Sequence, residues 1–140
     1  MAGSDPYLDA LANVPLFSAC SKKELQLVAK RGEHRRAEPG ATLVSEGSAG
    51  AEFFVILDGR ARVERHGREV AELGPGGFFG DLALLDRAPR NASVIALTDM
   101  SLAKLGQRAF DGLLETVPGC AKKLLAGLAR RLRVADAQSL

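Results

Sequence analysis

The chain has 140 residues, of which 46% are hydrophobic and 26% charged, as in ordinary globular proteins with one core. Its formal net charge of +2 is too small to argue for a surface that binds nucleic acid. No apolar run approaches the roughly 18 residues of a membrane span and no signal-peptide pattern opens the chain, so we expect a single cytoplasmic domain.

Two short helices are predicted within residues 1–31. Asp5 and Pro6 open the first, because Asp is a good N-cap and Pro suits the first helical position. Ser21 and Glu24 have the spacing of a capping box at the start of the second. Both helices have an apolar side that predicts packing against a core.

From residue 32 onward the pattern changes, and glycines recur between short apolar or alternating runs. Such spacing is typical of an all-β barrel or sandwich. Residues 53–57 are typical of a buried strand, and Asp58-Gly59 predicts a tight hairpin turn into residues 61–65. His66-Gly67 predicts a second turn.

The last third of the chain predicts two strands and then two helices. Residues 93–97 and 100–105 are expected to form the last pair of strands. Apolar residues share one face of 109–117, and Pro118-Gly119 interrupts that helix. From residue 121 to residue 134, apolar residues recur at steps of three and four, which predicts an amphipathic helix.

One stretch, residues 78–92 with the sequence FFGDLALLDRAPRNA, carries the chemistry. Gly80 marks a positive φ or a close approach of the backbone. Asp81 precedes an apolar run about one helical turn long, so we expect it at a helix start, whose N–H groups attract an anion. Arg90 adds a guanidinium. An acceptor, exposed amides and a cation in one loop predict a site for a phosphate beside a sugar hydroxyl.

The same stretch resembles the phosphate-binding cassette of cyclic-nucleotide-binding domains, whose pattern is F-G-E-(L/M)-A-L, a short spacer, and P-R-(A/S/T)-A. Two positions depart from it: Asp81 replaces a Glu, and Asn91 replaces a small residue. The positions that match are Phe79, Gly80, Leu82, Ala83, Leu84, Pro89, Arg90 and Ala92.

The order of the predicted elements is similar to that family over essentially the whole chain. The resemblance implies a mainly β fold, an eight-stranded jelly-roll-like barrel with two N-terminal and two C-terminal helices. We expect a single domain over 1–140, with N-terminal helices in 1–31, the barrel in 32–105, the cassette in 78–92, and hinge and lid helices in 106–137.

The resemblance also implies roles for individual residues. It assigns Arg90 to the cyclic phosphate and Asp81 to the ribose 2′-hydroxyl. In the family the last helix closes over the base, and Leu128 and Arg131 are the candidates for that contact. The full set of expected ligand-binding residues is Phe79, Gly80, Asp81, Leu82, Ala83, Arg90, Asn91, Ala92, Leu128 and Arg131.

Metal and nucleophile chemistry have little support in the sequence. Cys20 and Cys120 are far apart in no metal or redox spacing, so we expect buried or half-buried thiols. His34 and His66 raise a cupin-type metalloenzyme as one alternative, but two isolated histidines lack the His-x-His or acid cluster that a metal needs. No serine, cysteine or lysine has an evident base partner in a motif.

The sequence therefore predicts a binding module and not an enzyme. Its expected ligand is cAMP, with cGMP as the alternative because Asn91 leaves base selectivity open, and no cofactor or metal is expected. We expect an unknown effector protein as partner, no direct contact with nucleic acid or membrane, and a homodimer as one option. Two further alternatives stay open: a degenerate domain that binds protein partners, and the sensor part of a transcription regulator lacking its DNA-binding domain.

Overall fold

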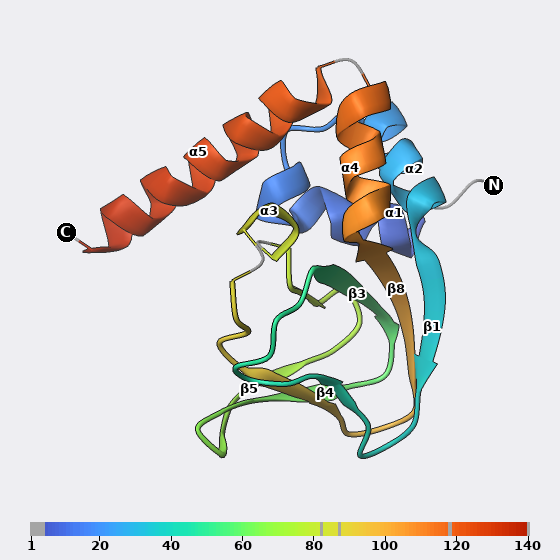
Figure 1. Cartoon of the computed structure of the whole chain (residues 1–140), viewed down its shortest axis with the longest axis vertical. Coiled ribbons are helices and arrows are strands. Elements are labelled where there is room, and N and C mark those ends of the chain that lie inside the picture. The colour runs from blue at the N-terminus through green and yellow to red at the C-terminus, as the bar shows by residue number, and fades with distance from the viewer. Residues whose placement is uncertain (1–4, 82, 87, 118, 140) are drawn as a thin grey trace.

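The computed structural model describes residues 5–81, 83–86, 88–117 and 119–139, in which helices flank two antiparallel sheets (Figure 1). In chain order the elements are α1 (Pro6–Asn13), the 3₁₀ helix η1 (Pro15–Phe17), α2 (Lys22–Arg31), β1 (Glu33–Ala37), β2 (Thr42–Val44), β3 (Glu52–Asp58), β4 (Ala61–Arg65), β5 (Arg68–Leu73), β6 (Phe78–Phe79), α3 (Ala83–Asp86), β7 (Ser93–Ala96), β8 (Met100–Gly106), α4 (Gln107–Thr116) and α5 (Cys120–Ser139).

The eight strands form a sandwich of two four-stranded sheets. One sheet has the order β1-β8-β3-β6 and the other β2-β7-β4-β5, with every pair antiparallel. The inner faces bury an apolar core, as expected when two sheets pack face to face. Its buried members are Phe54, Ile56, Ala61, Val94, Ala96, Met100 and Leu102. The predicted jelly-roll architecture with flanking helices is confirmed.

Two predicted strand pairings were wrong. Asp58-Gly59 was expected to turn a hairpin, but β3 pairs with β8 and β6 whereas β4 pairs with β5 and β7, so this turn connects the two sheets. The strands β7 and β8 likewise lie in different sheets. A turn signal reports local backbone shape, and it does not specify which strands pair. The His66-Gly67 turn does join the paired strands β4 and β5, and both residues have positive φ, 55° and 78°.

A second core lies at the end of the sandwich covered by the helices (Figure 1). The predicted caps are present: Asp5 accepts from the Tyr7 N–H, and Ser21 and Glu24 form a reciprocal capping box. The largest buried side chains of this core are Leu11, Leu16, Phe17, Phe53, Leu84, Leu105, Phe110 and Leu113.

The two cysteines are free thiols on the helical side, Cys120 buried and Cys20 half-buried, as predicted. Burial raises the pKa of Cys20 to about 11, and it also raises the pKa of Cys120. Both thiols therefore stay protonated and weakly nucleophilic at neutral pH.

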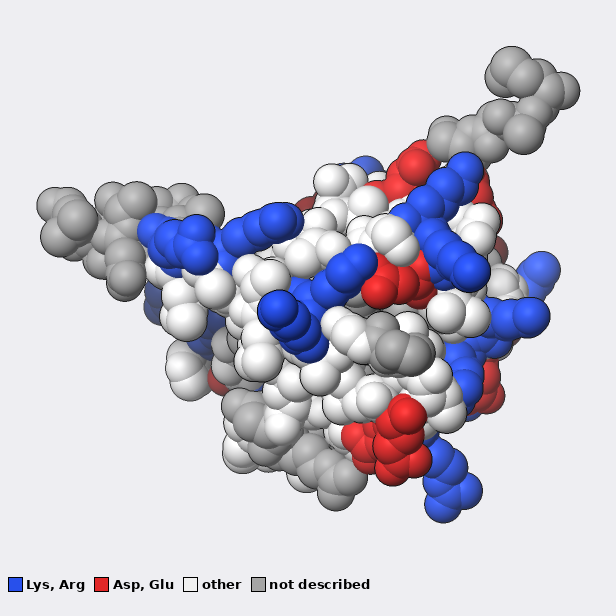
Figure 2. Space-filling view, turned by 90° about the horizontal axis from the view of Figure 1, so that it is seen from above, with Lys and Arg blue, Asp and Glu red and all other residues white. Residues whose placement is uncertain are grey.

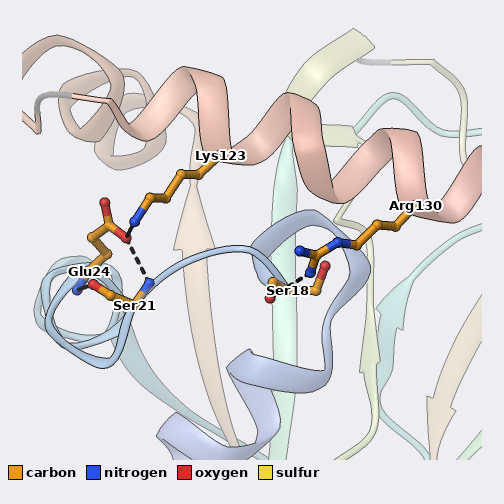
Figure 3. A network of polar contacts seen from close by, with 5 residues as sticks. All are labelled: Ser18, Ser21, Glu24, Lys123 and Arg130. Carbon is orange, nitrogen blue, oxygen red and sulfur yellow. Dashed lines mark hydrogen bonds and ion pairs between the residues drawn. The ribbon is translucent and has the colours of Figure 1, made fainter.

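Helix α5 lies across the N-terminal segment and then extends beyond the helical layer (Figure 1). At the crossing, Gly127 is needed because a Cβ there would overlap the carbonyl oxygens of Pro15 and Leu16. Two polar contacts flank the crossing (Figure 3). Lys123 Nζ lies 2.7 Å from Glu24 Oε1, and Arg130 Nη1 donates to the Ser18 carbonyl at 3.2 Å.

The surface on the helical side carries charges of both signs. Figure 2 shows basic side chains there separated by acidic and uncharged ones, with no broad single-sign field. Within the described parts of the chain, no helix is both long enough and apolar enough to cross a bilayer.

Candidate functional site

A cavity of about 580 Å³ lies beside the loop of residues 78–92, and we call it the cassette pocket. It is lined from three directions: by the second sheet, by the cassette loop and by one residue of α5. Its lining residues are Val44, Val63, Arg65, Leu73, Phe78, Phe79, Gly80, Asp81, Ala83, Ala88, Pro89, Arg90, Asn91, Ala92, Val94 and Arg131.

Two glycines shape the place of the Arg90 guanidinium. Gly80 has φ of +86°, a conformation that side chains rarely adopt, and a Cβ there would overlap both the Glu52 carbonyl oxygen and the guanidinium. A Cβ at Gly50 would overlap the guanidinium as well. The prediction from sequence that Gly80 provides a positive φ or a close approach is confirmed, since both apply.

Arg90 is half-buried and is fixed by a backbone group. Its Nη2 donates to the Glu52 carbonyl at 2.9 Å. Within the described residues no carboxylate lies in ion-pairing range of Arg90, so its charge is only partly compensated. Burial lowers the pKa of Arg90, and the nearby charge of Glu52 offsets part of that effect. An arginine stays charged at neutral pH even so, which leaves a cation in the pocket that an anion would stabilise.

Asp81 is the buried acid of the pocket, with 6% of its surface exposed. Its Oδ2 accepts from Arg131 Nη1 at 3.1 Å, across 50 positions of sequence. A buried carboxylate needs such a partner because it has lost its hydration. Arg131 therefore reaches the pocket, as expected from its place on the last helix, but it contacts the acid of the cassette.

Asp81 lies two positions before a short helix, and two amides at the start of that helix already have partners. Helix α3 has only four residues, Ala83–Asp86. The Ala83 N–H donates to the Gly80 carbonyl at 3.2 Å and the Leu84 N–H to the Asp81 carbonyl at 3.3 Å. These amides are engaged in turn contacts, so the cation of Arg90 is the main feature that attracts an anion.

The other predicted site residues occupy different places. Phe79 stacks on Phe54 with ring centroids 5.0 Å apart, Ala92 is buried, and Asn91 lies on the pocket wall. Leu128 is not part of the pocket lining and packs against the helical core. Leu82 lies outside the described residues.

Arg65 is a pocket residue that the sequence reasoning missed. Its Nε donates to the Asn91 carbonyl at 3.0 Å, so it connects β4 to the cassette. Alternation along β4 contained the signal, because Arg65 is two and four positions after Val63 and Ala61, which pack in the core between the sheets. Applying that rule would have placed Arg65 on the inner side.

The charges of the pocket favour an anionic ligand. Among the described residues its lining contains three guanidinium groups, of Arg65, Arg90 and Arg131, and one carboxylate, of Asp81. The apolar remainder suits a flat ring, as ligand pockets usually combine an apolar lining with a few polar groups. Among the described residues there is no cluster of three His, Cys, Asp or Glu side chains that would hold a metal ion.

Comparison with known proteins agrees with this geometry. A family model described as the cyclic nucleotide-binding domain matches residues 34–117, which include the whole cassette. The chain is similar to the N-terminal domain of a transcriptional regulator from Streptomyces coelicolor A3(2). That solved structure has a TM-score of 0.84 and 32% identity, and the match covers 93% of this chain and 94% of that one.

Two curated proteins are also similar to the chain. A cAMP-dependent protein kinase regulatory subunit from Colletotrichum orbiculare is 40% identical over 84% of this chain, and a cyclic AMP receptor protein from Thermus thermophilus is 34% identical over 87% of it. The matches span 30% and 59% of the lengths of these relatives, respectively.

Proposed function

This chain belongs to the cyclic nucleotide-binding domain family, and on that premise we propose that it binds cAMP in the cassette pocket. It is a regulatory binding domain and not an enzyme. The observation that carries the proposal is the position of Arg90. This half-buried cation lines the pocket, donates to the Glu52 carbonyl, and lies against Gly50 and Gly80. The names of relatives from Colletotrichum and Thermus support cAMP as the nucleotide.

In the proposed complex the cyclic phosphate docks on Arg90. A cyclic phosphate is a compact monoanion, and a guanidinium binds two of its oxygens in a planar fork. Gly50 and Gly80 keep the guanidinium in place, because neither adds a side chain that would displace it. The phosphate should contribute strongly to the binding free energy, because Arg90 is half-buried and the protein compensates its charge only in part.

Asp81 has two roles in this proposal. One carboxylate oxygen continues to accept the hydrogen bond from Arg131, and the other accepts a hydrogen bond from the ribose 2′-hydroxyl. The ligand would then strengthen the attachment of α5 to the cassette, because both share one carboxylate. Closure of α5 is favoured only to the extent that the closed state makes contacts that the open state lacks.

The purine is assigned to the apolar part of the pocket. Val63 and Leu73 supply that surface from the second sheet, and Arg65 and Asn91 border it. We propose adenine as the preferred base and guanine as the weaker one. The cytoplasmic location, the effector protein and a homodimer stay predictions from the sequence.

Thermal melts with cAMP, cGMP and linear AMP test the proposal. A ligand at 100 times its Kd adds about 2.7 kcal/mol of stability, which should raise Tm by several degrees. We expect cAMP to give the largest shift and AMP almost none, because linear AMP is bulkier and more highly charged at its phosphate. Equal shifts for cAMP and AMP would contradict a pocket built for a cyclic phosphate.

The similarity to the Streptomyces domain supports a second candidate function, in which nucleotide binding by this chain controls transcription. That structure is described as the N-terminal domain of a transcriptional regulator. In this alternative the chain is the sensor of such a regulator, and its response to the nucleotide passes to a DNA-binding part. A gel shift at stated salt, with and without cAMP, separates a sensor that acts on DNA from one that acts on a protein when the chain is assayed together with its proposed DNA-binding part.

A further inference from the structure

A second cavity, of about 490 Å³, opens between the edge strands β1 and β2. It shares no lining residue with the cassette pocket. We call it the edge cavity, and its lining residues are Arg35, Arg36, Ala37, Glu38, Ala41, Thr42, Leu43, Glu52, Phe54, Leu102 and Lys104. The wall between the two cavities includes the stacked pair Phe54 and Phe79, since each ring lines one of them.

Strand register explains why two charged side chains lie on the inward face of the sheet at the open edge of the sandwich. Arg35 is directly opposite Leu102, and Lys104 is opposite Phe54. Residues directly opposite in an antiparallel pair point to the same face. Because Leu102 and Phe54 belong to the core between the sheets, Arg35 and Lys104 share that inner face. The edge cavity therefore combines an apolar floor with two inward-facing cations.

The two cations differ in how well they are already paired. Lys104 is mostly buried, with 14% of its side chain exposed, and its Nζ lies 2.8 Å from a Glu52 carboxylate oxygen. Arg35 lies at the open mouth of the cavity with 50% of its side chain exposed, and its guanidinium has only a loose contact, 3.7 Å from Glu33, which is too long for a hydrogen bond. Its guanidinium fork is thus left without the bidentate carboxylate that it binds best.

We propose that the edge cavity is a second ligand site, which binds a small organic monocarboxylate with an apolar body. The carboxylate docks on the guanidinium of Arg35, and the apolar body covers Phe54, Leu102 and Leu43. Among the lining residues that the structure describes, Arg35 is the inward-facing cation whose guanidinium has no carboxylate within hydrogen-bond distance, so it is the group that would take the ligand carboxylate. A dianion such as phosphate lacks the apolar part that the floor favours.

The test uses 1-naphthoate as probe, added to the full chain and followed by backbone amide NMR shifts. We expect saturable shifts at Ala37, Thr42 and Phe54, with a dissociation constant of about 1 mM or lower. The neutral analogue 1-naphthalenemethanol, which has the same ring without the charge, should bind at least tenfold more weakly. Equal binding of the two compounds would overturn the role given to Arg35.

Two variants separate this site from the cassette pocket. Arg35→Gln should weaken naphthoate binding at least tenfold, and the matched change Arg68→Gln, on an exposed strand outside both cavities, should leave it unchanged. Arg90→Ala should also leave it unchanged, whether or not the chain binds cAMP. Shifts confined to the cassette pocket, loss of binding in Arg90→Ala, or no saturable shift would each contradict the proposal.

Discussion

Arg90 is a cation whose position is fixed by the protein and whose charge is compensated only in part. It is half-buried, and its backbone partner, the Glu52 carbonyl, fixes its direction without neutralising its charge. The motif located this residue, but its partner is 38 positions away in sequence and becomes visible only in the fold. The role of Arg90 is therefore best tested by the affinity for the ligand and not by the stability of the fold.

Replacement of Arg90 by alanine should weaken cAMP binding strongly. Losing one partner of a buried charged pair costs about 2–5 kcal/mol, which is roughly 30-fold to several thousand-fold in Kd. The fold should survive, because among the described residues the side chain makes one hydrogen bond to the protein, to the Glu52 carbonyl. Calorimetric titration measures the change. The exposed Arg68→Ala is the matched control, and an Arg90→Ala variant that binds as tightly as the parent would remove Arg90 from the site.

The ribose role of Asp81 has its own test, because the carboxylate already holds Arg131. If Asp81 also accepts from the 2′-hydroxyl, 2′-deoxy cAMP should bind the parent about 10- to 150-fold more weakly than cAMP, the ~1.5–3 kcal/mol of a hydrogen bond to a charged group. In Asp81→Asn that difference should shrink.

The opposite result is equally informative. Equal Kd values of the parent for cAMP and for its 2′-deoxy analogue would mean that Asp81 only anchors α5. Asp81→Glu then refines the geometry, since a side chain longer by one methylene strengthens binding if the aspartate is too short and weakens it if the loop has already moved inward.

At the scale of elements, α5 is attached to the N-terminal helices in part by the Glu24–Lys123 ion pair, whose strength depends on pH. The Lys123 ammonium and the Ser21 backbone N–H lower the pKa of Glu24 below its ordinary value of 4.5. Glu24 in turn raises the pKa of Lys123. A carboxyl group with a lowered pKa in the folded state contributes stability above its unfolded pKa. That contribution is lost as pH falls through the folded-state value.

Glu24→Gln isolates this charge, because glutamine still completes a capping box. At about pH 7 the variant should melt roughly 1–3 °C below the parent, as expected for one partly exposed ion pair. The deficit should shrink as pH falls below 4.5, since the parent then loses the same charge. Thermal melts of the parent and the variant, paired at each pH between about 7 and below 4.5, measure this Tm difference. A Tm difference that is the same at the highest and the lowest pH would mean that the ion pair contributes nothing.

Local elements were predictable, and long-range pairings were not. The caps at Asp5 and Ser21 and the positive φ at Gly80 depend on residues within a few positions, and all three are present. One partner of β3 is β8, about 50 residues later, and no turn residue specifies such a pairing. For this reason the Asp58-Gly59 signal was read as a hairpin when it connects two sheets.

At the scale of the whole molecule, the site is a product of topology as much as of the motif. The cassette supplies Asp81 and Arg90, which the sequence identified. Arg65 from β4 and the contact of Arg131 with Asp81 come from elements that the fold brings to the same cavity. Leu128, which the family resemblance assigned to the base, packs against the helical core and does not line the cassette pocket, so its role in binding stays a prediction.

The central claim is that the intact chain binds a cyclic nucleotide at one site, and calorimetric titration with cAMP tests it most directly. The protein is first freed of any bound nucleotide by unfolding and refolding, which absorbance at 260 nm verifies. We predict a saturable heat with one cAMP per chain. No saturable heat at cAMP concentrations up to about 1 mM, with the folded state verified by a cooperative melt, would contradict the claim and favour a degenerate domain that binds a protein partner.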